Sequence, residues 1–181
     1  MSNPAEMIEE ARANKRVALL IAALALALAL TEVAGDDAKT EAQMKNVESA
    51  NLWSFFQAKT IRQTTVRSLS EMLPLLAPKE GSAPEVGQLL ARWSSTLQRW
   101  ETEPETGEGR RELMARAKQA EQDRDEAMRM DARYDTASAL LQVGIVIASA
   151  AIITSTAILV WIGAALGGVG AALSLLTFLA V

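Results

Sequence analysis

Carboxylates are the only side chains in this sequence whose number and grouping suggest acid–base chemistry. There are 22 Asp and Glu residues but no His and no Cys, so the usual proton shuttle near neutral pH and the thiolate nucleophile are both absent. The paired carboxylates lie on charged helical surface such as the run 110–135, where no apolar cleft is evident that would shift their pKa values. We therefore expect no enzymatic activity, no catalytic residue, no metal site and no cofactor.

The most distinctive cluster is a run of aromatic residues followed by a cation, formed by Trp53, Phe55, Phe56 and Lys59. In one interpretation these side chains bind a partner protein or lipid headgroups. In the other, the aromatic rings fill the core of a helical domain and Lys59 is solvated. We favour the core, because a helix that starts near residue 36 would place the cluster about 25 Å beyond its start, too far for headgroup contact.

Small residues follow one face of the last apolar segment. Gly163 and Gly167 are four residues apart, as are Ala164 and Gly168. This small-xxx-small pattern lets the backbones of two membrane helices approach closely. The pattern does not distinguish contacts within one chain from contacts between copies, but neighbouring spans pack internally first, so we favour internal packing. The candidate interaction residues are Gly163, Gly167 and Gly168.

Polar residues within the second apolar segment have two interpretations. Gln142, Ser149 and Thr154 either form hydrogen bonds to neighbouring helices or line a pore. An ion pathway normally requires a charged residue inside the membrane, and Glu32, at the edge of the first apolar segment, is the only candidate. We therefore favour the structural interpretation and keep a homo-oligomeric channel or transport component as the alternative.

Charge is segregated along the chain, a pattern that distinguishes membrane proteins from soluble ones. Residues 17–31 and 136–181 carry no charged side chain, although Asp, Glu, Lys and Arg make up 22% of the sequence. An apolar helix of about 18 residues covers about 27 Å, just enough to cross the hydrocarbon core. We predict an all-α integral membrane protein with transmembrane helices at 17–34, 137–154 and 158–180.

A cleaved signal peptide is the alternative interpretation of the first apolar segment. Ala27 and Ala29 have the A-x-A spacing of a cleavage site. We favour a retained span, because acidic residues cancel the cations of the polar tail at 1–16 and the apolar stretch is long for a signal peptide.

Residues 35–136, between the first two spans, predict a helical extramembrane domain. Apolar residues recur at spacings near three and four in 36–77 and 85–103, and 110–136 is rich in strong helix formers. The stripes of these three helices can cover one another, so we expect a three-helix bundle or stalk.

Breaks and continuities between these elements follow from Gly and Pro. Pro74 and Pro78 should end the first helix of the domain, and the Pro- and Gly-containing run 103–109 should end the second. No Gly or Pro interrupts residues 110–143, so the third helix should run on into the second span. Asp36 suits a helix N-terminus, so whether the first span ends before it or continues stays open.

Residues at the ends of the spans are candidate interface anchors, because Arg, Tyr and Trp are common at the level of the lipid headgroups. The turn between the last two spans is placed at 154–156, where neither a charge nor a Pro marks it. The predicted anchors are Arg16, Arg133, Tyr134 and Trp161.

Two stretches and the order of the elements carry a family resemblance. The stretches are 51–63, with the sequence NLWSFFQAKTIRQ, and 133–142, with the sequence RYDTASALLQ. With one span, a helical region and then two closely spaced spans, the chain resembles a bacterial family of small membrane proteins known only as a domain of unknown function. Members of that family tend to carry Arg at the last turn, where this chain has Thr154-Ser-Thr. The resemblance implies an architecture but no activity, cofactor or substrate.

Topology and function are expectations drawn from charge and from the lack of a chemical constellation. Arg12, Lys15 and Arg16 favour a cytoplasmic N-terminus, which places the helical domain in the periplasm of a bacterial inner membrane. A net charge of −4 argues against nucleic acid as a partner. We expect a membrane-anchored helical scaffold or accessory subunit whose partners are the lipid bilayer and either further copies of itself or another membrane protein complex.

Overall fold

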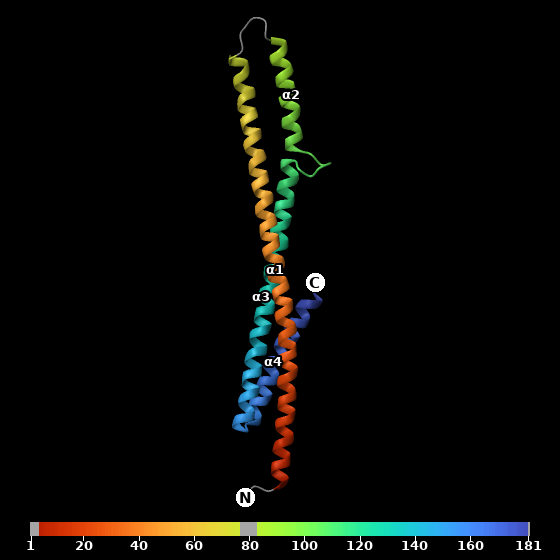
Figure 1. Cartoon of the computed structure of the whole chain (residues 1–181), viewed down its shortest axis with the longest axis vertical. Helices are drawn as coiled ribbons and strands as arrows, with labels where there is room; N and C mark the ends of the chain where they lie inside the picture. The colour runs from red at the N-terminus through yellow and green to blue at the C-terminus, as the bar shows by residue number, and fades with distance from the viewer. Residues whose placement is uncertain (1–3, 77–82, 181) are drawn as a thin grey trace. The chain divides into compact units, whose positions relative to one another are not determined.

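The computed structural model describes residues 4–76 and 83–180, and the elements in these ranges are four helices and no strand. This all-helical class is the one the sequence predicts. The chain forms two compact units. We call 43–124 the charged unit and the remainder of the described chain the span unit. The helices are α1 (Pro4–Leu76), α2 (Ala83–Glu101), α3 (Arg110–Thr154) and α4 (Ala157–Leu179) (Figure 1).

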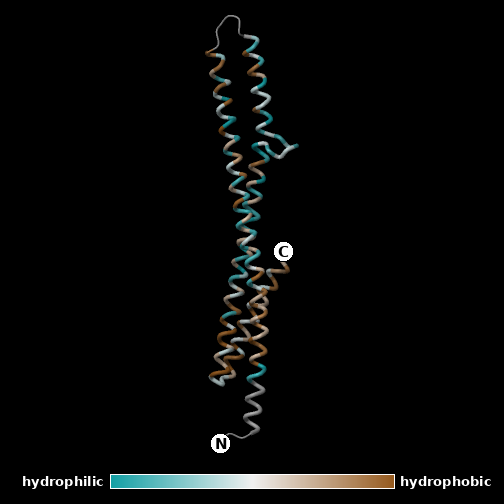
Figure 2. Tube along the Cα trace, in the orientation of Figure 1, coloured by the Kyte–Doolittle hydropathy of each residue, from teal (hydrophilic) through white to brown (hydrophobic). Residues whose placement is uncertain are grey.

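The span unit consists of the first part of α1, the second part of α3 and all of α4. Each of these three helices is long and apolar enough to cross a membrane. Figure 2 shows their apolar residues gathered in this unit. On α1 the residues buried against the other helices recur every seven positions, at Val17, Leu24, Thr31 and Ala38, so one narrow stripe of α1 contacts protein.

The turn between α3 and α4 is short, because only Ser155 and Thr156 separate the two helices. Ser155 has φ of 52°, which places it in the left-handed region that ends many helices. Thr156 is extended and precedes the first turn of α4. This turn lies within the predicted range 154–156, and it lets α3 and α4 form a tight antiparallel pair.

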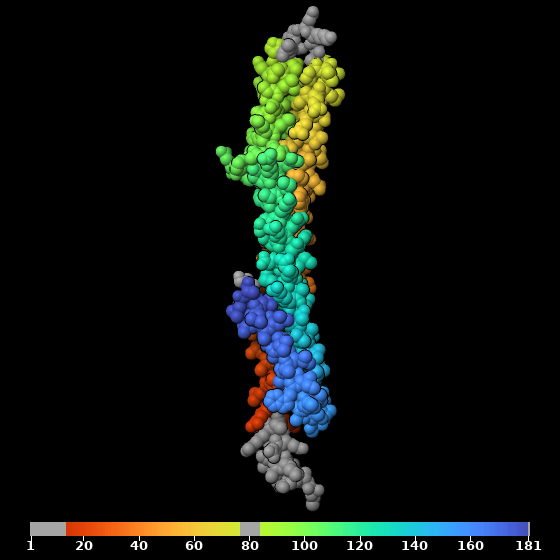
Figure 3. All heavy atoms as spheres, turned by 180° about the vertical axis from the view of Figure 1, so that it is seen from behind, coloured from red at the N-terminus to blue at the C-terminus, as the bar shows by residue number. Residues whose placement is uncertain are grey.

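The charged unit differs from the predicted three-helix bundle. Its α2 and the first part of α3 follow one another along α1 rather than lying side by side (Figures 1 and 3). The connecting segment 102–109 contains Pro104, Gly107 and Gly109 and projects from the side of the unit (Figure 3). This segment connects α2 to the start of α3, and the two helices lie end to end along α1. At each level of the charged unit α1 therefore has a single helical neighbour.

The helix boundaries agree with the prediction in part. The sequence left open whether the first span ends before Asp36, and no break occurs there, since α1 continues from the apolar segment into the charged unit. Pro74 lies inside α1, two residues before its end, where its missing N–H costs one hydrogen bond of the last turn. Most of the loop predicted around Pro78 lies outside the described residues. The predicted run of α3 from charged residues into apolar ones is observed, as a helix over Arg110–Thr154.

Candidate functional site

The aromatic cluster divides between core and surface. Trp53 and Phe56 pack on the buried residues of the charged unit, with ring centroids 5.4 Å apart and planes at 89°. The indole Nε1 of Trp53 donates a hydrogen bond of 2.8 Å to Oε1 of Glu121 on α3. Phe55 is 57% exposed, on the side of α1 away from this core. The structure therefore gives Trp53 and Phe56 a packing role and leaves Phe55 open to a partner.

Lys59 is not solvated, contrary to the interpretation from sequence. It is only 9% exposed, its Nζ donates a hydrogen bond to the carbonyl oxygen of Glu108, and it lies 3.8 Å from a carboxylate oxygen of Glu103. Position 59 is seven residues after Leu52, so the helix directs it toward the same neighbour. Lys59 thus fastens the segment 102–109 to α1.

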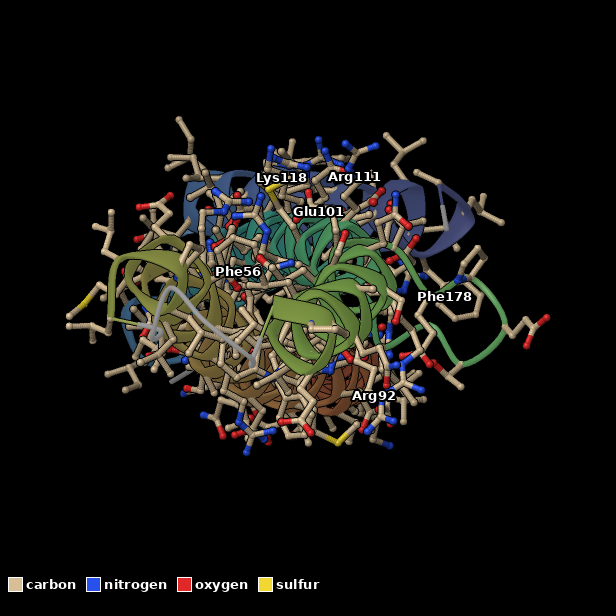
Figure 4. All side chains as sticks on the ribbon, turned by 90° about the horizontal axis from the view of Figure 1, so that it is seen from above. Phe56, Arg92, Glu101, Arg111, Lys118 and Phe178 are labelled. Atoms are coloured by element: carbon tan, nitrogen blue, oxygen red, sulfur yellow. The ribbon has the colours of Figure 1, made fainter. Side chains whose placement is uncertain are left out.

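Glu101, the last residue of α2, accepts hydrogen bonds from three side chains of the charged unit. Arg110 donates to both carboxylate oxygens, at 3.0 and 3.1 Å, and Nε of Arg111 donates to Oε1 at 3.2 Å. The amide of Gln63 on α1 donates to Oε2 at 3.2 Å and also lies 3.3 Å from the carbonyl oxygen of Leu97. Figure 4 shows Glu101 between Phe56 and Arg111 in a view along the helices.

These contacts set the charge state of Glu101. The hydrogen bond from Arg110 is the largest influence, and together with those from Gln63 and Arg111 it lowers the pKa of Glu101 from 4.5 to about 2, against partial burial, which acts in the opposite direction. Glu101 is therefore ionised at any physiological pH, and it joins α1, α2 and α3.

Sequence reasoning missed this network. Gln63 and Glu101 are 38 positions apart and the arginines follow a Gly- and Pro-containing turn, so spacing alone does not bring them together. One feature of the sequence could have indicated the network. Gln63 follows Phe56 by seven residues, which places it on the inner face of α1, where it is buried. A buried amide needs hydrogen-bond partners, and an acidic residue on a neighbouring helix can accept from it.

The small-residue face of α4 is used within the chain. A Cβ atom at Gly163 would lie 2.7 Å from the carbonyl oxygen of Gly144, and one at Gly167 would lie 2.6 Å from a methyl group of Leu24. Nothing lies within 4 Å of a Cβ atom placed at Gly168. Gly163 and Gly167 thus permit close helix contacts, whereas Gly168 faces away. Gly170, on the small-residue face expected from sequence, belongs to the same contacts, as does Gly144 of α3, which was not singled out from sequence.

The polar residues of the apolar segments are hydrogen-bonded. Ser149 and Thr154 donate to carbonyl oxygens of their own helix at 2.8 and 2.9 Å. The amide of Gln142 donates to Glu32 at 3.3 Å, and Thr31 lies 2.8 Å from Ser174 of α4. Gln142 therefore bonds to a neighbouring helix as expected, whereas Ser149 and Thr154 bond within their own helix.

Of the four predicted interface anchors, three are exposed and one is buried. Trp161 is 76% exposed, and Arg16 and Arg133 are also exposed. Tyr134, in contrast, is only 5% exposed, because its Cβ lies against Gly35 of α1, 3.2 Å from a Cβ placed there. Tyr134 therefore packs two helices of the span unit together instead of pointing outward.

Within residues 4–76 and 83–180 no group of three or more acidic side chains could hold a metal ion, and the described chain holds no His or Cys that could serve instead. Comparison with curated proteins and with solved structures finds no match. The sequence from 13 to 180 matches the family described as a domain of unknown function, DUF4337. Since that match covers nearly the whole chain, this protein belongs to the DUF4337 family.

Proposed function

We propose that this chain is a membrane-anchored helical scaffold or accessory subunit that associates with itself. Three helices are long and apolar enough to insert in a bilayer. The described residues of the charged unit are held by packing and by ion pairs that join helices to one another. In this proposal the spans fix the protein in the membrane and the charged unit provides a contact surface.

One observation carries the proposal, namely the apolar side chains that α1 exposes in the charged unit. Phe55, Leu69 and Leu76 recur at steps of seven or fourteen, and Met44 and Met72 lie on the same flank of the helix. Exposed apolar residues that share one face of a surface helix mark interaction sites. Spacings of seven and fourteen place them where a second helix can contact them, although the charged Arg62 occupies the position between Phe55 and Leu69.

The location follows the charge argument from sequence. We propose a bacterial inner membrane with the charged unit in the periplasm, because Lys15 and Arg16 at the start of the first candidate span favour the cytoplasm. The remaining basic residues lie in a connection of about 100 residues, where the charge rule has less weight.

The mass of the complete chain in lipid nanodiscs tests self-association. We expect a single assembly larger than one copy. The double variant Phe55→Ser with Leu69→Ser should shift the mass to one copy, because both side chains leave the exposed stripe. Gln57→Ser is the matched control, since Gln57 is exposed on the same helix and makes no hydrogen bond to a described residue.

A wild-type chain of monomer mass would refute self-association. It would leave only the accessory role, in which crosslinking in membranes should join a different protein to the wild type and to Gln57→Ser but not to the double variant. A monomer with equal crosslinking of all three variants would rule out the whole proposal.

A further inference from the structure

A groove of 510 Å³ lies in the charged unit where α1, the end of α2 and the start of α3 meet. Its volume is within the range of pockets that hold small molecules. α1 contributes Arg67, α2 contributes Leu90, Ser94, Leu97 and Gln98, and α3 contributes its first two residues. The groove is separate from the exposed stripe of α1, because none of the residues Phe55, Leu69 or Met72 lines it.

The charge of the groove is positive although the protein is acidic. Arg67, Arg110 and Arg111 line it together with one carboxylate, Glu101, whereas the whole chain has a net charge of −4. Arg110 uses its Nε and one Nη for Glu101, and Arg111 uses only its Nε. A guanidinium has five N–H donors, so most of the donors on Arg111 are not used by Glu101.

Further donors in the groove have no partner within the described chain. The side chains of Arg67, Ser94 and Gln98 form no hydrogen bond or ion pair with another described residue. The neighbouring Gln63, by contrast, is buried and held by Glu101 and by the carbonyl oxygen of Leu97. The groove therefore combines one side chain held in place, Gln63, with hydrogen-bond donors that have no partner in the described chain.

The groove also has an apolar component. Leu90 and Leu97 of α2 line it and are half-buried. Ligand pockets characteristically combine apolar walls with a few polar groups that fix orientation. Arg recognises carboxylate and phosphate groups with paired hydrogen bonds, and a Ser hydroxyl and a Gln amide can add single donors.

From this arrangement we infer that the groove binds a small soluble molecule that carries a phosphate or carboxylate group on a short apolar body. Arg67 and Arg111 bind the oxyanion, Ser94 and Gln98 donate further hydrogen bonds, and Leu90 and Leu97 contact the apolar body. The Arg110–Glu101 pair keeps the end of α2 in place beside the ligand. This site is independent of the proposed self-association.

The test is isothermal titration of the complete chain in nanodiscs made of phosphatidylcholine, with hexyl phosphate, hexanoate and hexanol as probes. At least one of the two anions should bind at least about tenfold more tightly than hexanol, because hydrogen bonds to charged groups are the stronger ones. The better anion identifies the group the site prefers. Addition of phosphatidylglycerol to the bilayer shows whether a lipid headgroup displaces that anion or the site serves soluble molecules.

Two arginine variants separate the site from general electrostatics. Arg67→Gln should weaken anion binding about tenfold or more, because it removes a guanidinium from the groove. Arg62→Gln removes the same charge from the same helix at a position that is exposed like Arg67 but lies outside the groove, and should leave binding within about twofold. Circular dichroism checks that both variants keep their helices.

Three results would overturn the inference. Equal losses in the two arginine variants would show that the anion responds only to the overall charge. Binding of hexanol as tight as that of the anions would show that affinity comes from the apolar contacts with Leu90 and Leu97 alone. No binding of either anion at about 10 mM, the weak end of specific recognition, would show that the groove is ordinary solvated surface.

Discussion

Glu101 shows how one carboxylate can join three helices. Glu101 lies on α2, and its two oxygens accept hydrogen bonds from Gln63 on α1 and from Arg110 and Arg111 on α3. The three helices of the charged unit therefore meet at this one residue. Loss of this one charge would deprive two guanidiniums of their carboxylate and leave the buried amide of Gln63 with only the carbonyl oxygen of Leu97, which costs more than loss of an isolated surface pair.

The stability of this junction should depend on pH through Glu101. Because the folded pKa of about 2 lies below the ordinary value of 4.5, its contribution is fully present above about pH 4.5 and is lost as the pH falls toward 2. We expect Glu101→Gln to destabilise the junction by about 1 kcal/mol at pH 7 and by less at pH 2.5. Hydrogen exchange of the segments around 97–113, compared between variant and wild type at each pH, measures this difference.

Glu105→Gln is the matched control for this experiment. Glu105 is exposed in the connecting segment and makes no hydrogen bond to a described residue, so its replacement should not change exchange at either pH. A difference between Glu101→Gln and wild type that stays constant from pH 7 to 2.5 would contradict the assignment.

At the scale of elements, the contact between α3 and α4 depends on glycine at defined positions. A Cβ at Gly144 would lie 2.8 Å from both the carbonyl oxygen of Gly163 and the backbone nitrogen of Gly167, and a backbone cannot move aside as a side chain can. We expect Gly144→Ala to destabilise the helix pair by about 1–3 kcal/mol. Unfolding of the chain by SDS, followed by circular dichroism, measures the change.

Gly168 provides the internal comparison for that substitution. A Cβ there meets nothing within 4 Å, so Gly168→Ala should be neutral or stabilising by up to about 1 kcal/mol, since Ala has the higher helix propensity. If both variants unfold at the same SDS fraction, close backbone approach does not hold α3 against α4.

The sequence predicted those elements whose cause is local. The continuity of α3 from charged into apolar residues follows from the lack of Gly and Pro in 110–143, and the short turn after Thr154 follows from the length of the apolar tail. The arrangement of α2 did not follow, because an apolar stripe on α2 can cover α1 or α3 equally well. Asp36 suits a helix start, but α1 continues through it, and a Cβ placed at the preceding Gly35 would lie 3.2 Å from Tyr134 of α3.

The candidate site was less predictable than the fold. The aromatic residues were found from their types, and the sequence correctly suggested a core role for Trp53 and Phe56. Lys59 was expected to be solvated because Lys side chains are usually exposed. Its position on the inner face of α1, however, already indicated burial. The arginine-lined groove requires residues from three helices, and no spacing rule brings these together in advance.

At the scale of the whole molecule, the absence of Cys allows the proposed topology to be tested with single introduced thiols. We expect Glu105→Cys to react with a membrane-impermeant maleimide in intact cells, because it lies in the connection proposed to be periplasmic. Ser155→Cys, in the turn between α3 and α4, should react only after permeabilisation. The reverse pattern would place the charged unit in the cytoplasm, and equal reaction of both would contradict three crossings.

The spacing of buried residues along α1 restricts how insertions and deletions can accumulate in this family. Within the charged unit α1 runs unbroken beside the start of α3 and the end of α2. Removal of one residue there would rotate the remainder of that helix by about 100° and turn its inner face away from its neighbour, whereas removal of seven restores it almost completely. Relatives of different length should therefore differ by whole heptads, removed from α1 and from the helix beside it together. The positions that define this repeat on α1 of the charged unit are Ser49, Leu52, Lys59 and Gln63.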